Sequence, residues 1–232
     1  MKLYTFYSPS HAVLYERYFR PSLKDDFDVV VKVVPEQICQ KGGEYFAPGW
    51  RETMLIKVDM ILGAITEQPG EMFLFADADV QFFEPVVPLV TAAMAGVDAA
   101  FQRDHPSGTR CAGFFACRGT PAALDLWQTT RRTVLENRQF DDQIALNWLL
   151  DRAMVDVKWT LLPDCFLSGG TIDADRGQWQ PGKRLTVPDD IVAHHANWTV
   201  GVPNKIAQLD YVRQIVAARR DRVVAPQGRS TS

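Results

Sequence analysis

Two aspartates one residue apart, Asp77 and Asp79, follow the apolar run at residues 72–76, MFLFA. The run predicts a short buried strand, and residues i and i+2 of a strand share a face, so both carboxylates project together where the strand leaves the core. Such carboxylates repel each other unless a cation lies between them. A hard divalent ion, Mg²⁺ or Mn²⁺, carrying a phosphate on its open positions suits this place. The alternative is a solvated, Asp-rich turn, but the apolar residues on both sides favour the metal–phosphate site.

A second group of residues with chemical potential lies near the end of the sequence. His195 offers an imidazole that suits Mn²⁺ just after a predicted strand, whereas we expect its neighbour His194 to be structural or exposed. Gly201 permits close backbone approach, and Pro203 begins a predicted helix whose N-terminus attracts anions. Lys205 lies in the first turn, where the helix dipole disfavours a cation unless a phosphate is bound. The alternative for this group is a surface lysine and a core histidine.

Asp142 and Gln143 lie at the start of another predicted helix. One interpretation is that Asp141 or Asp142 is only the N-cap of that helix. The other places an acid and an amide in a polar cleft beside the metal.

Five further positions are weaker candidates. Ser8 begins the polar loop after the first predicted strand, where open α/β sheets commonly bind nucleotides. Gly113 and the pair Gly169-Gly170 are ordinary turn glycines or points where the backbone approaches a ligand. Lys57 lies among apolar helix positions; it is a candidate for binding the donor, although we expect it to extend its ammonium to water along the helix surface.

Composition limits the possible functions. The chain has 232 residues, 47% of them hydrophobic, and a formal net charge of -3, which argues against a nucleic-acid-binding surface. The four cysteines form no CxxC pair, so we expect reduced thiols. We find no secretory signal and no apolar run of membrane-spanning length, and we expect a soluble cytoplasmic protein without a membrane span.

Outside the motifs, the sequence alternates predicted strands and helices. Apolar and β-branched runs predict strands at residues 3–7, 27–34, 72–76, 98–101, 112–117, 155–159 and 191–193. Apolar spacing, N-caps and first-turn prolines predict helices at residues 12–20, 50–67, 85–95, 121–137, 140–150 and 203–218. The order predicts an α/β fold with a mainly parallel central sheet flanked by helices.

We expect one domain at residues 1–218, followed by a polar tail at residues 219–232 that frays. The loop at residues 37–49 contains Gly42-Gly43 and Pro48-Gly49 and is predicted to be mobile, without an assigned role.

Three segments together resemble the nucleotide-diphospho-sugar transferase family of GT-A glycosyltransferases, which includes plant rhamnogalacturonan xylosyltransferases. Residues 73–80 are similar to the DxD motif of that family, residues 142–147 to its DQxxLN segment, and residues 195–205 to its C-terminal H…G…K block. The glycogenin and lipopolysaccharide galactosyltransferase group is more distantly similar. The resemblance covers residues 3–212 and implies a Rossmann-like GT-A fold.

The resemblance also implies roles for the candidates. Asp77 would contact the donor ribose or the metal, Asp79 and His195 would ligate Mn²⁺, and Gly201 and Lys205 would touch the diphosphate.

For the sugar end of the donor, the resemblance places Asp142 by the donor sugar or the acceptor and Gln143 near the anomeric carbon. Gly113 would belong to the strand under the sugar.

We therefore expect a metal-dependent glycosyltransferase that uses a nucleoside-diphosphate sugar, most simply a UDP-sugar, and transfers it with retention to a sugar, lipid-linked or protein acceptor. One rival is a Mg²⁺-dependent phosphatase of the haloacid dehalogenase type, for which Asp189-Asp190 would be the downstream acidic pair. The other rival is a catalytically inactive module that binds nucleotide sugars.

Overall fold

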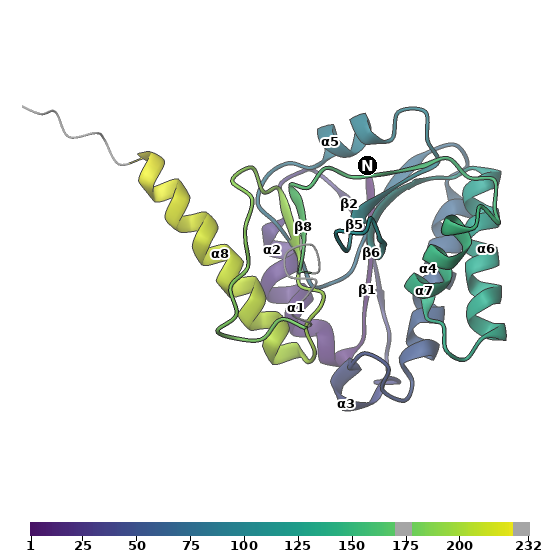
Figure 1. Cartoon of the computed structure of the whole chain (residues 1–232), viewed down its shortest axis with the longest axis horizontal. Coiled ribbons are helices and arrows are strands. Elements are labelled where there is room, and N and C mark those ends of the chain that lie inside the picture. Colours follow the sequence, from purple (N-terminus) through teal and green to yellow (C-terminus); the bar gives the residue numbers. More distant parts are fainter. Residues whose placement is uncertain (170–177, 225–232) are drawn as a thin grey trace, which may run out of the picture.

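The computed structural model describes residues 1–169 and 178–224 (Figure 1). Its centre is a six-stranded sheet in the order β2-β1-β3-β6-β5-β7. Only β6 runs antiparallel to its neighbours, so the sheet is mainly parallel, as predicted. In chain order, the strands of this sheet are β1 Lys2–Tyr7, β2 Asp28–Val33, β3 Met72–Ala76, β5 Ala99–Arg103, β6 Arg110–Arg118 and β7 Trp159–Leu161.

A second, three-stranded sheet extends the first beyond the acidic motif. Its order is β4-β9-β8, formed by β4 Val80–Phe82, β8 Phe166–Ser168 and β9 Ala193–His195. The sequence did not predict β4 or β8, because three residues are too few for a propensity pattern. This sheet matters for the site because it holds the segment that follows the two aspartates beside the C-terminal histidines.

Helices cover both faces of the central sheet (Figure 1). On one face lie α4 Trp50–Glu67, α6 Pro121–Glu136 and α7 Asp142–Asp151. The other face carries α1 Ala12–Leu14, α2 Arg20–Ser22 and α5 Val87–Ala93. Helix α8 Val202–Val224 packs outside this layer, against the small sheet and the segment that contains α1. The short α3 Gln40–Gly43 lies within the loop at residues 37–49.

Successive side chains of β3 point to opposite faces of the central sheet and pack under different helices. Phe73 and Phe75 belong to the core under α4 and α6, whereas Leu74 and Ala76 belong to the core on the opposite face. All four side chains are fully buried. A strand buried on both faces explains why the run before the aspartates is continuously apolar.

Several element boundaries differ from the prediction, including that of the strand expected at residues 191–193, which is β9 at Ala193–His195. The strand expected at residues 155–159 is β7 at Trp159–Leu161, because the chain pairs with β5 only from Trp159 onward. The helix expected at residues 12–20 contains a π-helical turn at Tyr15–Phe19. Helix α8 continues past residue 218 to Val224, where Arg219 and Arg220 bind backbone carbonyl oxygens of neighbouring loops. The rest of the predicted tail, residues 225–232, lies outside the described residues, as does Gly170.

All four cysteines are buried free thiols, as predicted. Within the described ranges, every helix is too short or too polar to cross a lipid bilayer. The cytoplasmic location stays a prediction.

Candidate active site

The carboxyl ends of three parallel strands open into one cavity of about 310 Å³. Ser8 follows β1, Asp77 follows β3 and Asp104 follows β5, which is the edge where open α/β sheets bind ligands. Ten of the sequence-predicted site residues line this cavity, whereas Gly169 does not: Ser8, Lys57, Asp77, Asp79, Gly113, Asp142, Gln143, His195, Gly201 and Lys205.

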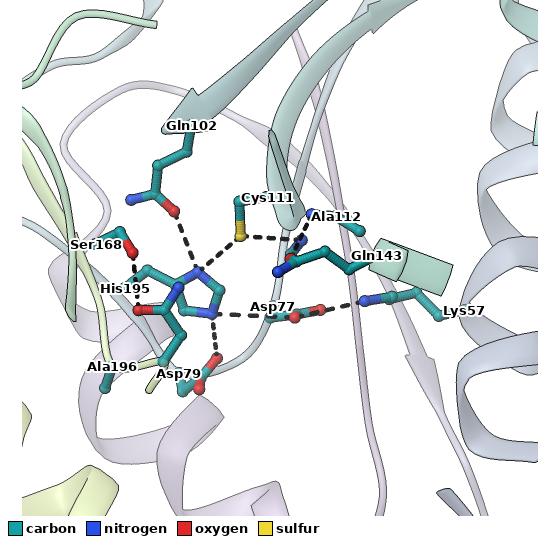
Figure 2. Close-up of polar contacts among 12 residues, drawn as sticks. Lys57, Asp77, Asp79, Gln102, Cys111, Ala112, Gln143, Ser168, His195 and Ala196 are labelled. Carbon is teal, nitrogen blue, oxygen red and sulfur yellow. Dashed lines mark hydrogen bonds and ion pairs between the residues drawn. The ribbon is translucent and has the colours of Figure 1, made fainter. Parts of the chain in front are cut away.

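Pairing between β4 and β9 brings His195 to the two aspartates (Figure 2). Val80 is the register partner of His195, so the residue before Val80 lies beside the imidazole. Nε2 of His195 is 3.2 Å from Oδ1 of Asp79 and 4.0 Å from Oδ2 of Asp77. His194 is fully buried on the opposite face of the strand and does not join the cluster.

These three side chains fit a divalent metal ion. One candidate ligand atom from each lies within 4.8 Å of the others, and Oδ1 of Asp77 is buried without a hydrogen-bond partner. Carboxylate oxygens with one imidazole suit Mn²⁺ or Mg²⁺. Gly113 preserves the space: a Cβ there would lie 2.3 Å from Oδ2 of Asp77 and 2.7 Å from Cε1 of His195.

A buried amide orients the imidazole. Nε2 of Gln102 donates to the Phe166 carbonyl oxygen at 3.2 Å, which turns Oε1 of Gln102 toward Nδ1 of His195, also at 3.2 Å. Nδ1 therefore donates to Gln102, and Nε2 faces the carboxylates (Figure 2). The thiol of Cys111 lies 3.5 Å from the same Nδ1.

Burial and neighbouring charges shift the pKa values of Asp77, Asp79 and His195 in the ligand-free cluster. Burial raises the pKa of Asp77 to about 6, although Lys57 opposes the shift. For Asp79, burial is outweighed by Lys205 and His195, which hold its pKa well below the usual range. For His195, burial is outweighed by Asp79, so its pKa is raised well above the usual value. A divalent ion that bound through Nε2 of His195 at neutral pH would therefore displace its proton.

Lys205 lies in the first turn of α8, as predicted. Its Nζ donates to Oδ2 of Asp79 at 2.5 Å and to the Ala196 carbonyl oxygen at 3.0 Å. Gly201, just before the helix, has φ of +85°, a left-handed conformation that favours glycine. The arrangement puts a cation and a helix N-terminus at the same edge of the metal cluster, which is the setting that binds phosphates.

Lys57 does not extend to water, so that prediction is wrong. Its side chain is 4% exposed, and its Nζ lies 2.5 Å from Oδ2 of Asp142 and 3.7 Å from Oδ2 of Asp77. Burial opposes the charge of Lys57, but the two carboxylates outweigh burial and raise its pKa. Lys57 stands on the buried stripe of α4 between Met54 and Ile61, and this stripe meets the cavity instead of the surface.

The start of α7 separates a structural aspartate from a site aspartate. Asp141 is the N-cap, and its Oδ1 accepts from the Ile144 amide at 2.8 Å. Asp142 is the next residue and faces Lys57, so the capping interpretation applies to Asp141 alone. Gln143 is fixed at both ends of its amide: Oε1 accepts from the Ala112 amide at 3.0 Å, and Nε2 donates to Asp104 at 2.7 Å.

Asp104 is a site residue that the sequence analysis missed. It is 1% exposed and accepts hydrogen bonds from Gln143, from Nδ2 of Asn197 and from Nε1 of Trp198. Oγ of Ser168 also donates to it at 3.0 Å. Asp104 belongs to no motif, but it follows a predicted buried strand as Asp77 does, and that shared position was the available signal.

The remaining weak candidates have local partners. Ser8 is buried, with its Oγ 3.3 Å from Oγ of Ser10. Gly169 is needed for packing, because a Cβ there would lie 2.5 Å from the Asn197 carbonyl oxygen. Asp189, half of the acidic pair that a phosphatase would require, has a side chain that is 95% exposed and pairs with Arg219. Neither Asp189 nor Asp190 lines the cavity.

Known structures share this fold. A glycosyltransferase involved in glycosylation of the major capsid of PBCV-1 aligns with TM-score 0.59 and 11% identity, covering 92% of this chain and 100% of that chain. The galactosyltransferase LgtC, solved with donor and acceptor sugar analogues, aligns with TM-score 0.54 and 9% identity over 94% of this chain and 96% of that one. GlyE of Streptococcus pneumoniae TIGR4 aligns with TM-score 0.53 and 10% identity over 94% of this chain and 64% of that one.

Sequence comparison identifies the family. No curated protein sequence matches the chain significantly. The profile of the nucleotide-diphospho-sugar transferases matches residues 28–209, which include both aspartates, the start of α7 and the first turn of α8. The chain belongs to the nucleotide-diphospho-sugar transferase family and is a glycosyltransferase of GT-A fold.

Proposed function

We propose that this glycosyltransferase is metal-dependent, uses a UDP-sugar as donor and transfers the sugar with retention of anomeric configuration. The observation that carries the proposal is the cluster of Asp77, Asp79 and His195 at the carboxyl end of β3, with Lys205 at its edge. UDP and retention follow from the resemblance of the three motifs to the family.

Asp79, His195 and Asp77 would hold Mn²⁺ or Mg²⁺, which when bound supplies Lewis-acid stabilisation of charge on the departing nucleoside diphosphate. Lys205 is already within 2.5 Å of Asp79, so its ammonium needs little movement to reach a diphosphate at the cluster. The α8 N-terminus beside Gly201 adds backbone N–H groups and a positive partial charge. Together these groups stabilise the anion that leaves, which lowers the barrier to transfer.

At the other wall of the cavity, the side chains suit the sugar. Asp142 and the Gln143 amide present oxygen acceptors, and Lys57 fixes the position of the buried Asp142 through their ion pair. Gln143 is bound on both sides, so it holds its position as positive charge develops on the sugar. Fixed oxygen dipoles near the anomeric carbon favour a front-face, retaining transfer.

A donor screen tests the proposal. Purified protein is treated with EDTA, supplied with UDP-, GDP-, CDP- or dTDP-sugars, and assayed for sugar release with and without Mn²⁺. We expect metal-dependent release from UDP-sugars, and NMR of the first-formed product of transfer to an alcohol acceptor should show the donor's anomeric configuration. Metal-independent turnover, or phosphate release from simple phosphomonoesters, would contradict the proposal.

A further inference from the structure

Exposed aromatic rings gather at the mouth of the cavity. Tyr45 is 51% exposed, Phe46 46% and Trp198 37%, and within residues 1–169 and 178–224 these are the aromatic members among the exposed large hydrophobic side chains. Trp50 lies behind Tyr45, with ring centroids 5.4 Å apart. Tyr45, Trp50 and Trp198 line the cavity itself. We refer to Tyr45, Phe46, Trp50 and Trp198 as the aromatic rim.

The loop that carries Tyr45 and Phe46 is pinned at its base. The Gln40 amide donates to the Pro48 carbonyl oxygen at 2.8 Å, and at Gly49 a Cβ would lie 2.1 Å from the Ile38 carbonyl oxygen. Phe46 itself has φ of +57°, and its ring meets that of Tyr45 edge-on at 4.5 Å. A non-glycine residue in the left-handed region costs free energy, and such strain concentrates at functional sites.

Trp198, on the segment that follows β9, is also fixed in position. Its φ is +53°, its Nε1 donates to Asp104 at 3.0 Å, and its ring lies near that of His105. The backbone and the indole N–H are thus fixed while the ring stays partly exposed. Two segments far apart in the sequence therefore present ordered aromatic faces to solvent at one opening.

Carboxylates lie beside these rings. Asp104 binds Trp198 directly, and the Tyr45 hydroxyl lies in the field of Asp141, Asp142 and Asp104, which together with burial raises the pKa of Tyr45 to about 12. An aromatic face beside hydrogen-bond acceptors matches a pyranose, whose C–H face is apolar and whose edge carries hydroxyl donors. An acyl chain would cover the rings but would also desolvate the half-buried Glu44, which lines the cavity next to Tyr45, and this is unfavourable.

We propose that the aromatic rim is the acceptor site and that the acceptor is a glycan whose terminal pyranose stacks on Tyr45 and Trp198. This inference rests on the proposed function, because it takes the donor to occupy the metal cluster and the floor of the same cavity. The rim then covers the open side, where an acceptor hydroxyl must approach.

The test is saturation-transfer NMR with methyl glycosides and disaccharides of the common hexoses, on protein held with UDP and Mn²⁺. Wild type should saturate the C–H protons of at least one glycoside. Tyr45→Ala should weaken that binding by about 10-fold, whereas Tyr45→Phe, which keeps the ring, should bind as wild type does. Leu135→Ala is the matched control, because Leu135 is also 51% exposed but lies on α6.

Calorimetry of UDP with Mn²⁺ on the same samples distinguishes failure of the proposed function from failure of the rim inference. If wild type fails to bind UDP, the proposed function fails. If UDP binds but no glycoside does, or if Tyr45→Ala binds glycosides as wild type does, the rim inference alone is overturned. Ring-dependent binding to phosphatidylcholine vesicles or to peptides, in place of glycosides, would equally overturn the glycan assignment. Melting curves confirm that each variant is folded.

Discussion

The cavity has two walls, and each pairs one lysine with one buried aspartate. On the wall formed by the small sheet and α8, Lys205 lies 2.5 Å from Asp79. On the wall formed by α4 and α7, Lys57 lies 2.5 Å from Asp142. The Lys205 side chain is 17% exposed and follows a helix N-terminus, whereas Lys57 is 4% exposed and is enclosed by helices.

The difference in exposure between the two lysines indicates that the ion pair on the α8 wall can be exchanged for contacts with a ligand. Lys205 is more accessible and can release Asp79 to a metal ion while turning to a phosphate. Lys57 has no such exit, so its pair with Asp142 is a fixed dipole that stays in place when a ligand binds. Asp77 lies between the walls, 3.7 Å from Lys57 and 4.0 Å from His195, and it retains the oxygen atom without a partner.

The comparison is tested most severely on the α8 wall, by Asp79→Ala. The variant loses a proposed metal ligand and the partner of Lys205, so UDP affinity in the presence of Mn²⁺ should fall at least about 100-fold, since even outer-shell changes cost about 10–100-fold. Calorimetry with and without Mn²⁺ measures this. Asp59→Ala is the control, because it removes an aspartate that pairs with Arg131 outside the cavity. An unchanged metal requirement in Asp79→Ala would refute the metal assignment.

The opposite wall should respond in turnover and not in nucleotide affinity. Asp142→Asn keeps the shape of the side chain but removes the charge that faces Lys57, so the position and field at the sugar change while the diphosphate contacts remain. We expect the Kd of UDP with Mn²⁺ to stay close to the wild-type value and kcat to fall about 100-fold. If kcat and melting temperature are both unaffected, Asp142 has no role in transfer and the two walls do not differ in function.

A smaller effect should arise behind the metal cluster, at Gln102. Gln102→Leu removes the acceptor for Nδ1 of His195, so Mn²⁺ affinity should fall about 10-fold. Gln81→Leu is a matched control, because Gln81 is also buried but pairs in register with His194 and not with His195. Both variants can lose stability, but only Gln102→Leu should alter Mn²⁺ binding in calorimetry. Equal Mn²⁺ affinities in the two variants would rule out the orienting role.

The smallest effect concerns stability on the α7 wall. Burial and the Asp142 carboxylate raise the pKa of Asp141 from 3.8 to about 6. The folded state therefore favours protonated Asp141, and this contribution to stability is complete below pH 3.8 and lost as pH rises through 6.

Asp141→Asn keeps a good N-cap but cannot ionise. Its free energy of unfolding should exceed that of wild type by about 1 kcal/mol at pH 7, because the uncharged amide avoids burying a second negative charge beside Asp142. Urea titrations from pH 4 to pH 7 should show the two curves converging at low pH. A difference that is constant with pH would contradict the raised pKa.

Most of the sheet and the long helices could be predicted from the sequence, because their signals are local. The predicted bounds of α4 agree with the structure, and the Thr120-Pro121 start of α6 is an N-cap followed by proline. The small sheet was harder, because three-residue strands depend on partners far along the chain. Strand β7 was misplaced for the same reason: pairing with β5, and not alternation, decides where it begins.

The candidate site was predictable where motifs mark it and not where packing decides. Asp77, Asp79 and His195 were identified from position and residue type, but Lys57 was misjudged because helical spacing cannot show that a buried stripe ends against carboxylates. Asp104 was missed because its partners come from three separate segments. Its position after a predicted strand was one signal, but a single acidic residue without a repeated pattern does not show which distant segments converge on it.

The residues that form the core and those that complete the cavity are synthesised at different times, which has a consequence for folding on the ribosome. The core beneath α4 and α6 is formed by residues between Tyr4 and Leu161, so it can pack before the last segments have left the ribosome. His195 and Lys205 arrive only afterwards, with β9 and α8. A nascent chain can thus pack this core before it contains His195 and Lys205, so the candidate site is completed after the core beneath it.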